Sequence, residues 1–288
     1  MRFLVAVDGS ETGKNALKQT LAFVKQAGGE VIAITVPFYY GAEFELGLVG
    51  TTEEVFTGPA EAVLTEAREA AKEMGVEINT VMETGTVHQA IVKTATANDV
   101  DLIVMGRRGL TRFERALMGS VTSRVIGYSP IDVLVIPRES VLKWDKVLLP
   151  VDGSKYSDEA AKRAIELTKN YGGKLTILTV VDINPELFAI APDIADQVEM
   201  GAKSIVDEAK ALAEKAGIDA EMVLVEGEPY EKIIGVAKDV GAGLICMGSH
   251  GRTGIGRLMM GSVTERVIGE ATTPVLVVKT SQAAPLIK

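Results

Sequence analysis

The stretch from Phe3 to Ser10, FLVAVDGS, returns later in the chain as Val147 to Ser154, VLLPVDGS. A second stretch, LMGSVTSRVIG at residues 117–127, returns as MMGSVTERVIG at residues 259–269. The two pairs lie almost the same distance apart along the chain, which is the signature of an internal repeat. The sequence therefore predicts two copies of one structural unit.

The length of the chain agrees with two copies. The chain has 288 residues, and single domains usually have about 100 to 200 residues. We therefore predict two domains, residues 1–141 and 142–288, with a short polar linker near residues 137–143.

Within each copy, short runs of β-branched residues alternate with helical patterns, which is typical of βαβ units and a parallel sheet. In the first copy the predicted strands cover residues 3–7, 30–36, 77–82, 102–105 and 133–136. In the second copy they cover residues 146–151, 174–180, 219–225, 244–247 and 275–278. The same order of elements in both copies predicts an α/β fold for each.

A helix is predicted before the third strand of each copy. In the second copy, apolar residues recur at three- and four-residue spacing, which predicts a buried helix face. This stripe consists of Val198, Ala202, Ile205, Ala209, Leu212 and Ala216. Gly217 follows as a predicted helix stop, and Gly75 has the same place in the first copy.

Composition excludes several classes of protein. A net charge of −9 argues against general nucleic-acid binding, which needs an excess of basic residues on one face. We expect neither a signal peptide nor a membrane span, because no apolar run is long enough. The single cysteine, Cys246, fits a reducing compartment, so we expect a cytoplasmic protein.

A glycine-rich loop follows the fourth predicted strand of each copy. It reads Gly106-x-x-Gly109 and Gly248-x-x-Gly251, and nine residues later a Gly-Ser pair opens a helix. Glycines let the backbone approach a ligand closely, and the amides at a helix start attract anions. Serine and threonine hydroxyls add further donors. The loop therefore predicts a phosphate-binding site in each copy.

Basic residues gather around this loop in an acidic chain. The first copy carries the arginines Arg107, Arg108, Arg112, Arg115 and Arg124, and the second carries His250, Arg252, Arg257 and Arg266. Local positive charge suits a phosphate ligand. Taken singly, Arg115, Arg124, Arg257 and Arg266 are better interpreted as solvated helix-face charges.

An aspartate follows the first strand of each copy, in Asp8-Gly9-Ser10 and Asp152-Gly153-Ser154. Ligands of open parallel sheets bind at the carboxyl ends of the strands, where a carboxylate can accept hydrogen bonds from ribose hydroxyls. The alternative is an N-cap or an Asx-turn before the first helix, which needs no ligand.

The remaining reactive side chains suggest little catalysis. Neither His88 nor His250 recurs in the other copy, and we expect each to be a surface or loop residue. Cys246 lies in an apolar strand and is expected to pack in the core. With so few such residues, we predict no metal-ligand cluster and no nucleophilic triad.

These motifs resemble the universal stress protein family, in its ATP-binding branch. The resemblance rests on the spacing G-x-x-G-x9-G-[ST], on the VDGS motifs and on the ending Thr273 to Lys279, TPVLVVK. It covers nearly the whole chain as two tandem domains. It implies a Rossmann-like domain with five parallel strands in the order 3-2-1-4-5.

The resemblance also implies the ligand and its contacts. ATP or AMP would bind with the ribose near the first-strand aspartate and adenine near Val36 or Val180, and Mg²⁺ or Mn²⁺ could accompany it. The implied nucleotide-binding residues of the first copy are Asp8, Val36, Gly106, Arg107, Arg108, Gly109, Gly119, Ser120, Val121 and Thr122. Those of the second copy are Pro150, Asp152, Val180, Gly248, Ser249, His250, Gly251, Arg252, Gly261, Ser262, Val263 and Thr264. Family domains pair through the fifth strand, which implies internal pairing of the two halves and leaves a homodimer of two chains open.

The second copy follows the family pattern more closely than the first. It has Pro150 where the first copy has Ala6, and Ser249-His250 where the first has Arg107-Arg108. We therefore expect ATP in the second copy more firmly than in the first.

Three functions stay open at this point. The first is a regulatory protein of the stress response that binds an adenine nucleotide and hydrolyses it slowly or not at all. The second is a weak ATPase that uses Asp8 or Asp152 with a divalent ion. The third is an interaction protein of the stress response whose loops no longer bind nucleotide.

Overall fold

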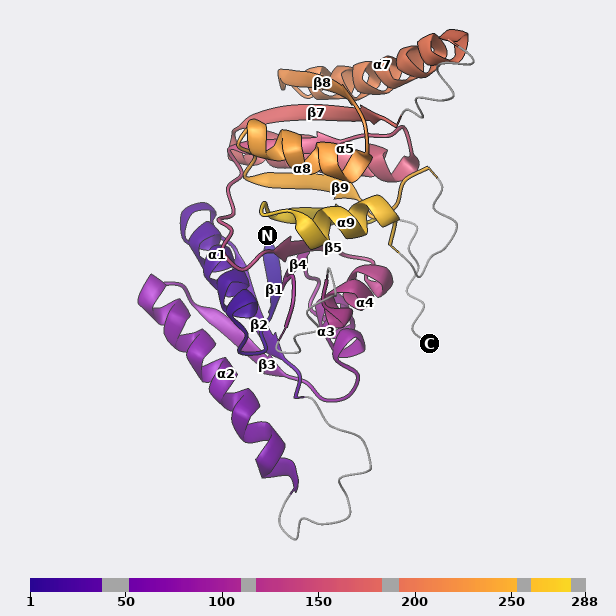
Figure 1. Cartoon of the computed structure of the whole chain (residues 1–288). Coiled ribbons are helices and arrows are strands. Elements are labelled where there is room, and N and C mark those ends of the chain that lie inside the picture. Colours follow the sequence, from indigo (N-terminus) through magenta and orange to yellow (C-terminus); the bar gives the residue numbers. More distant parts are fainter. Residues whose placement is uncertain (38–51, 110–117, 183–191, 253–259, 281–288) are drawn as a thin grey trace. The chain divides into compact units, whose positions relative to one another are not determined.

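The protein is described by a computed structural model that covers residues 1–37, 52–109, 118–182, 192–252 and 260–280. The chain divides into two compact units, Met1–Glu139 and Ser140–Lys288 (Figure 1). The domain boundary expected between residues 141 and 142 and the pairing of the fifth strands stay predictions.

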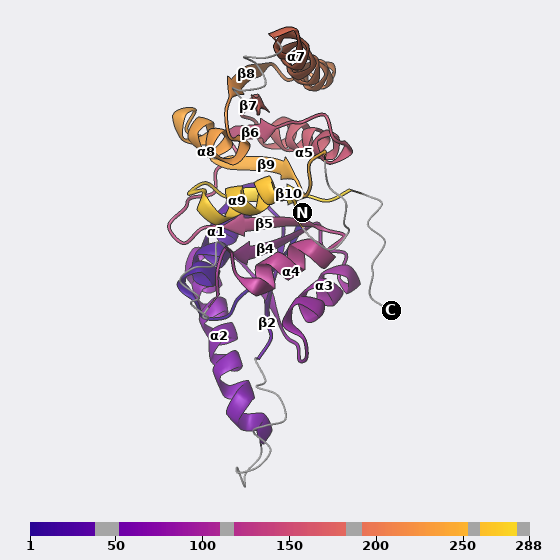
Figure 2. The ribbon, with the colours of Figure 1, turned by 45° about the vertical axis from the view of Figure 1, so that its right-hand side comes forward.

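The first unit is a five-stranded parallel sheet covered by helices on both faces. Its strands are β1 (Arg2–Ala6), β2 (Glu30–Thr35), β3 (Ile78–Met82), β4 (Leu102–Gly106) and β5 (Asp132–Ile136). Its helices are α1 (Glu11–Ala27), α2 (Thr52–Met74), α3 (Val87–Ala97) and α4 (Ser120–Tyr128). The strand order is β3-β2-β1-β4-β5. Helices α1 and α2 cover one face, and α3 and α4 cover the other (Figure 2).

The second unit repeats this arrangement. Its strands are β6 (Lys146–Pro150), β7 (Lys174–Val181), β8 (Ala220–Glu226), β9 (Leu244–Gly248) and β10 (Val275–Val278). Its helices are α5 (Lys155–Tyr171), α7 (Pro192–Lys215), α8 (Pro229–Asp239) and α9 (Ser262–Glu270). The strand order is β8-β7-β6-β9-β10, again parallel. Helices α5 and α7 lie on one face, and α8 and α9 lie on the other (Figure 2).

The predicted fold class is confirmed, and every predicted strand end lies within one residue of the observed one. The central strands are buried on both faces, as in β1, where Phe3, Leu4 and Val5 are at most 1% exposed. A strand covered by helices on both sides needs apolar residues throughout rather than an alternating pattern. Continuous apolar runs were therefore a reliable sign of these strands.

The predicted buried face of α7 is displaced from the observed one. Ala202, Val206, Ala209 and Ala213 are buried, whereas Val198 is 40% exposed. Leu212, which was also predicted to be buried, is 36% exposed. Alanines let the helix lie close to the sheet, so the packed stripe follows the small residues and leaves two larger apolar residues at the margin.

Both predicted helix stops are confirmed. Gly75 has φ +71° and Gly217 has φ +81°, and each lies just after the long helix of its unit. A side chain is strained in this left-handed conformation, which is why glycine commonly ends helices.

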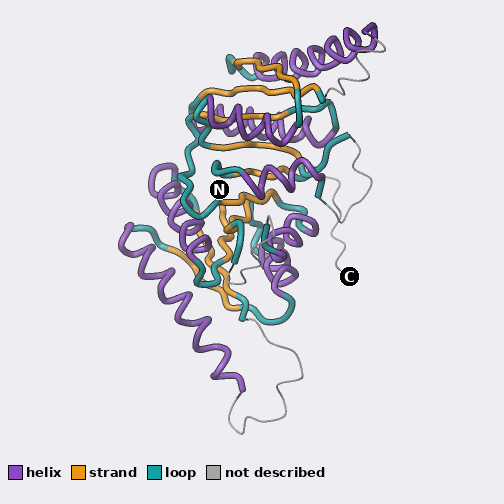
Figure 3. Tube along the Cα trace, in the orientation of Figure 1, coloured by secondary structure: helices purple, strands orange, loops and turns teal. Residues whose placement is uncertain are grey.

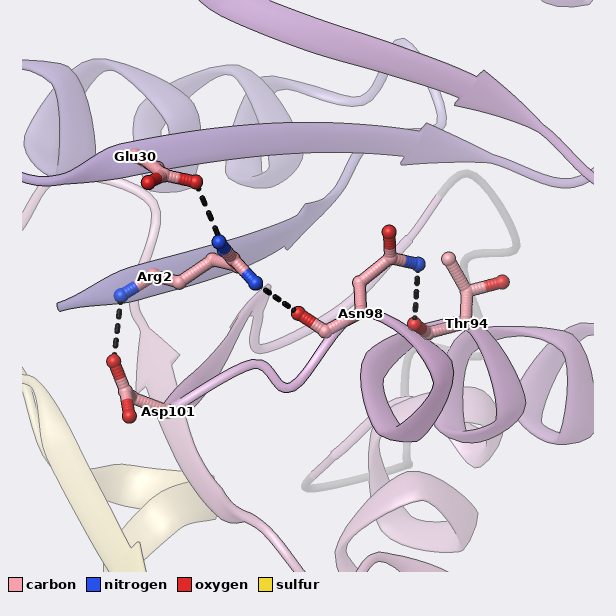
Figure 4. A network of polar contacts seen from close by, with 5 residues as sticks. All are labelled: Arg2, Glu30, Thr94, Asn98 and Asp101. Atoms are coloured by element: carbon pink, nitrogen blue, oxygen red, sulfur yellow. Dashed lines mark hydrogen bonds and ion pairs between the residues drawn. The ribbon is translucent and has the colours of Figure 1, made fainter.

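The amino-terminal end of the first sheet is tied together by Arg2 (Figure 4). Its backbone N–H donates to Asp101 Oδ2 at 2.7 Å, and its guanidinium donates to Glu30 Oε2 at 2.9 Å and to the Asn98 carbonyl at 2.7 Å. The Asn98 side chain in turn donates to the Thr94 carbonyl at 2.8 Å. The network joins β1, β2 and the end of α3 at the amino-terminal ends of the strands. The glycine loop follows the opposite, carboxyl ends, so the network has a structural role.

Two expectations about single residues have different outcomes. Cys246 is fully buried in β9, as predicted, and its thiol lies 3.6 Å from the Ala160 carbonyl. The expectation for His88 was wrong, because it lies in α3, is only 8% exposed and packs against the Tyr128 ring at 5.2 Å. Because His88 does not recur in the second copy, no sequence pattern indicated this stacking. In the described part of the chain, no helix has both the length and the apolar character to cross a membrane.

Candidate functional site

The candidate site of the second unit lies where the parallel strands β6, β7 and β9 end, next to the start of α9. In Figure 3 these strands are orange, and because they are parallel their carboxyl ends lie at the same end of the sheet. The chain crosses to opposite faces of the sheet after β6 and β9, so a crevice forms between their ends.

A cavity of about 520 Å³ occupies this crevice. One part of its wall is apolar, and it is formed by Pro150, Val151, Leu178, Val180, Pro229, Ile233, Met247, Met260 and Val263. The other part is polar, and it is formed by Asp152, Ser157, Gly248, His250, Gly251, Gly261, Ser262 and Thr264. The cavity therefore suits a ligand with a flat apolar portion and an anionic portion.

Gly248, Gly251 and Gly261, the glycines of the loop motif, are required for tight packing. A Cβ at Gly248 would lie 2.7 Å from the backbone of Tyr156, and one at Gly251 would lie 2.8 Å from Asp152 Oδ2. At Gly261 it would lie 3.2 Å from the Cα of His250. We expected glycine to make room for a ligand, but at Gly248 it makes room for the first turn of α5. Gly248, Gly251 and Gly261 all border the cavity, and at each of them a side chain would also meet the protein itself.

The start of α9 provides hydrogen-bond donors to the cavity. Gly261 is the N-cap residue, and no side chain of the described residues caps the helix. The first backbone bond of the helix runs from the Glu265 N–H to the Gly261 carbonyl at 2.9 Å. The N–H groups of Ser262, Val263 and Thr264 therefore have no acceptor within the helix. Together with the positive end of the helix dipole, they form a favourable place for an anion.

Asp152 joins the two loops that border the cavity. Its Oδ1 accepts the Ser154 N–H at 3.0 Å, and its Oδ2 accepts the Arg252 N–H at 3.1 Å. The Arg252 Nε also donates to the Asp152 carbonyl at 2.5 Å. The Asx-turn considered from the sequence is thus present, whereas the N-cap is Ser154, which accepts the Ser157 N–H at 3.2 Å. An ionised carboxylate has about four acceptor positions, so Asp152 keeps capacity for a ligand hydroxyl.

The Thr264 hydroxyl is already engaged within the protein. It donates to the Gly248 carbonyl at 3.0 Å, and Thr264 is 3% exposed. Threonine hydroxyls were predicted to be phosphate donors, but this one fixes the end of β9 against α9. Thr264 therefore reaches the cavity through its backbone.

His250 lies in the polar wall and is held by two neighbours. Its Nδ1 is 3.0 Å from Ser249 Oγ, and its ring packs against the Tyr156 ring with centroids 4.9 Å apart. Ser249 is itself buried and does not line the cavity. Arg252, which was also predicted to contact the ligand, is exposed. These contacts fix the orientation of the His250 ring in the wall of the cavity.

The first unit repeats the frame of this site. Asp8 Oδ1 accepts the Ser10 N–H at 3.0 Å, and Thr122 Oγ1 donates to the Gly106 carbonyl at 3.0 Å. A Cβ at Gly109 would collide with Asp8 Oδ2. The predicted residues at the ends of β1, β2 and β4 and at the start of α4 thus lie at the same sheet edge, while residues 38–51 and 110–117, with Arg112 and Arg115, lie outside the described part.

Two of the remaining predicted charges are helix-face residues. Arg124 and Arg266 are both exposed, in α4 and α9. Arg266 lies 3.8 Å from Glu228 and 4.7 Å from the centre of the Tyr230 ring. Arg257 is outside the described residues.

Most of the apolar wall of the cavity was not predicted from the sequence. Leu178 and Met247 precede predicted site positions by one or two residues, and Ile233 lies on α8, far along the chain from any motif. Pro229 could have been predicted as a wall residue, because it begins α8 shortly after the carboxyl end of a strand. Apolar wall residues resemble core residues in a sequence, so only the geometry separates them.

The class of protein that this fold and this site define is an α/β protein with a doubly wound parallel sheet and a crevice at the carboxyl ends of its strands. A sequence model of the universal stress protein family matches residues 1–137 and again residues 143–279. The chain therefore belongs to the universal stress protein family, as two tandem domains.

Individual relatives agree with this assignment. A universal stress protein of Methanocaldococcus jannaschii is 36% identical over 140 residues, which cover 47% of this chain and 82% of the relative. One of Mycolicibacterium smegmatis is 28% identical over 210 residues, covering 71% of this chain and 70% of the relative. The crystal structure of a universal stress protein from Archaeoglobus fulgidus superimposes with a TM-score of 0.70 at 25% identity. That comparison covers 96% of this chain and 98% of the other, so the tandem arrangement is shared along the whole length.

Proposed function

We propose that the second unit binds an adenine nucleotide, ATP or AMP, and that the protein acts as a nucleotide-responsive regulator in the stress response. The observation that carries this proposal is the cavity whose apolar wall ends at the uncapped start of α9. The base lies against Val180 and the neighbouring apolar residues, the ribose lies near Asp152, and the phosphates lie on the amides of Ser262, Val263 and Thr264.

The dimensions and chemistry of the cavity support a nucleotide. Small-molecule sites usually have volumes of about 300 to 1,000 Å³, with apolar walls and a few well-placed polar groups, and this cavity of about 520 Å³ is within that range. A phosphate at a helix start gains from several N–H donors at once. An apolar ligand alone would leave these donors without partners.

The groups at the cavity favour binding over rapid hydrolysis. Of the residues that line it, Asp152 and His250 are the ones with titratable side chains. Asp152 already holds the two loops together, and the His250 ring is fixed by Ser249 and Tyr156. A general base needs a free position next to the attacking water. In this proposal the remaining acceptor capacity of Asp152 is taken by a ribose hydroxyl, so we propose little or no hydrolytic activity.

A divalent ion in this site would depend on the ligand. In the described part of the chain, no group of three or more Asp, Glu, His and Cys residues is arranged to hold a metal. Mg²⁺ commonly binds through one or two carboxylates together with substrate phosphates, and Asp152 is the carboxylate at this site. The bound nucleotide would then supply the other ligands of Mg²⁺ or Mn²⁺.

The proposal is tested with the purified full-length chain. Denaturation followed by analysis of the released small molecules is expected to yield an adenine nucleotide, or else added ATP is expected to raise the melting temperature, because a ligand that binds only the native state stabilises it. The absence of both effects would contradict the proposal and favour an interaction protein without nucleotide.

The weak ATPase is distinguished by a second measurement. Phosphate release in proportion to protein concentration, lost in Asp152→Asn while ATP still binds, would favour the enzyme. Asn is chosen because its side-chain oxygen can still accept the Ser154 N–H, whereas Asp152→Ala also frees both loops. We expect no phosphate release above background from either protein.

A further inference from the structure

The two candidate sites differ most at the two residues between the first glycines of the loop. The second unit has Ser249 and His250, whereas the first has Arg107 and Arg108. In the second unit, His250 lines the cavity and its Cα lies against the N-cap of α9. The first unit therefore carries two permanent positive charges where the second carries a hydroxyl and an imidazole.

The backbone of the arginine pair is held against the start of α4. The Gly119 N–H donates to the Arg107 carbonyl at 2.9 Å, and a Cβ at Gly119 would lie 3.4 Å from the Cα of Arg108. The Arg108 carbonyl also accepts the Thr12 hydroxyl of α1. The backbone of both arginines is thus held next to the N–H groups that begin α4.

The Arg108 side chain lacks an acceptor for one of its donors. Its Nε is buried, and within the described residues no hydrogen-bond partner lies in reach. Buried donors without a partner are uncommon in native proteins, and such a donor often faces the position of a bound ion or water. The missing acceptor points to an anion beside the loop.

Arg107 is half-buried, and its surroundings disfavour its charge. Burial lowers the pKa of the Arg107 guanidinium, and the nearby positive charge of Arg108 lowers this pKa further. Two cations placed together in a partly buried position repel each other, and an anion with several charges relieves that repulsion. The geometry and the charges therefore favour a ligand more negative than a monophosphate.

We infer that the first unit selects adenine nucleotides by the number of their phosphates, and that it prefers ATP over AMP much more strongly than the second unit does. This inference rests on the proposed function. In each unit, the N–H groups at the start of the helix, α4 in the first and α9 in the second, bind one phosphate. In the first unit the guanidinium group of Arg108 binds the additional phosphates and Arg107 adds positive charge beside it, because arginine forms paired, charge-assisted hydrogen bonds with phosphate oxygens.

The experiment uses the full-length chain with one site disabled at a time. Gly251→Val blocks the second site, since its side chain meets Asp152, and Gly109→Val blocks the first in the same way against Asp8. Calorimetric titrations with ATP and with AMP then give the ratio of the two dissociation constants for each unit, at low and at high salt. Thermal melting of each variant verifies that the chain is folded.

The decisive variant places the second unit's residues in the first unit. In the Gly251→Val background, Arg107→Ser with Arg108→His is compared with the charge-conserving control Arg107→Lys with Arg108→Lys. We expect the preference for ATP over AMP to be at least about tenfold greater in the first unit, and the Ser-His variant to remove about that factor. The Lys-Lys control is expected to keep most of the preference, and added salt is expected to reduce it.

Equal ATP-to-AMP ratios in the two units, or a ratio unchanged by the Ser-His variant, would overturn this inference and leave the proposed function in place. Binding of nucleotide by the second unit alone would also overturn it. Failure of both units to bind any adenine nucleotide would contradict the proposed function and the inference together. The three outcomes are distinguished by the same set of titrations.

Discussion

At the scale of single residues, two buried threonines fix the frame of the candidate sites. Thr122 donates to the Gly106 carbonyl and Thr264 to the Gly248 carbonyl, both at 3.0 Å. Each bond ties the last residue of a central strand to the first turn of the following helix. Each bond thereby fixes where the glycine loop leaves the strand relative to the start of the helix.

We predict that Thr264→Val destabilises the second unit by about 1 to 3 kcal/mol, because the isosteric side chain leaves the Gly248 carbonyl without this donor in a buried place. Urea denaturation measures the loss. The control is Thr272→Val, an exposed position where a change of roughly 0.5 kcal/mol or less is expected. Equal effects of the two substitutions would show that the buried bond does not fix the loop.

His88 gives the first unit a pH-dependent stability. Burial lowers the pKa of its imidazole, and the positive charge of Arg124 lowers this pKa further. The native state therefore holds a neutral ring, while the unfolded chain takes up a proton below about pH 6.5. The stability is complete above that pH and is lost as the pH falls from the unfolded pKa towards the lower folded pKa.

We predict that His88→Phe reduces the loss of stability between about pH 7.5 and about pH 5.5, since phenylalanine keeps the ring contact with Tyr128 and cannot be protonated. Urea midpoints of the original chain and the variant at both pH values provide the measurement. If the two proteins lose the same stability, His88 is not the source of the pH dependence.

At the scale of elements, α7 shows which residues determine the buried face of a helix. Its packed side consists of Ala202, Val206, Ala209 and Ala213. The predicted stripe shares Ala202 and Ala209 with this side, but it also includes Val198 and Leu212, which are exposed. Close approach of the helix to β7 and β8 favours small side chains at the contact, and this outweighs the hydrophobicity of single positions.

Two valines of α7 test this account in matched substitutions. Val206 is 4% exposed and Val198 is 40% exposed. Val206→Ala is expected to cost about 1 to 3 kcal/mol of unfolding free energy, because it removes buried methyl groups and leaves a cavity. Val198→Ala is expected to change it by roughly 0.5 kcal/mol or less. Chemical denaturation of both variants gives the comparison. A larger loss of unfolding free energy in Val198→Ala would contradict the observed burial and favour the predicted buried face.

The elements were easier to predict from the sequence than the site. Strands such as β1 and β6 carry continuous apolar runs between turn residues, so their bounds could be placed within one residue. The glycines of the site were also identified, since a side chain there would collide with its neighbours, and the aspartates were identified from their place directly after a strand. The partners of Thr264 and the apolar wall around Ile233 could not be predicted, because contacts across the fold leave no local pattern.

At the scale of the whole molecule, one duplicated unit gives two related sites with different charges. The frame is the same in both, from the aspartate after the first strand to the threonine after the last glycine. The residues between the glycines differ, with Arg107-Arg108 in one unit and Ser249-His250 in the other. If both units bind nucleotide as proposed, this difference in charge is where their ligand preferences would differ.

The central claim is that the crevice at the start of α9 binds an adenine nucleotide, and titration of the second site with ATP tests it most directly. The measurement compares Gly109→Val, Gly109→Val with Gly251→Val, and Gly109→Val with Gly201→Ala, so that the first site is blocked throughout. A side chain at Gly251 meets Asp152 Oδ2 at 2.8 Å, whereas one at Gly201 has open space. We expect ATP to bind the first and third proteins with the same affinity and the second at least about a hundredfold more weakly. Undiminished binding in the protein that carries Gly251→Val, with melting curves that show it folded, would contradict the assignment of the site.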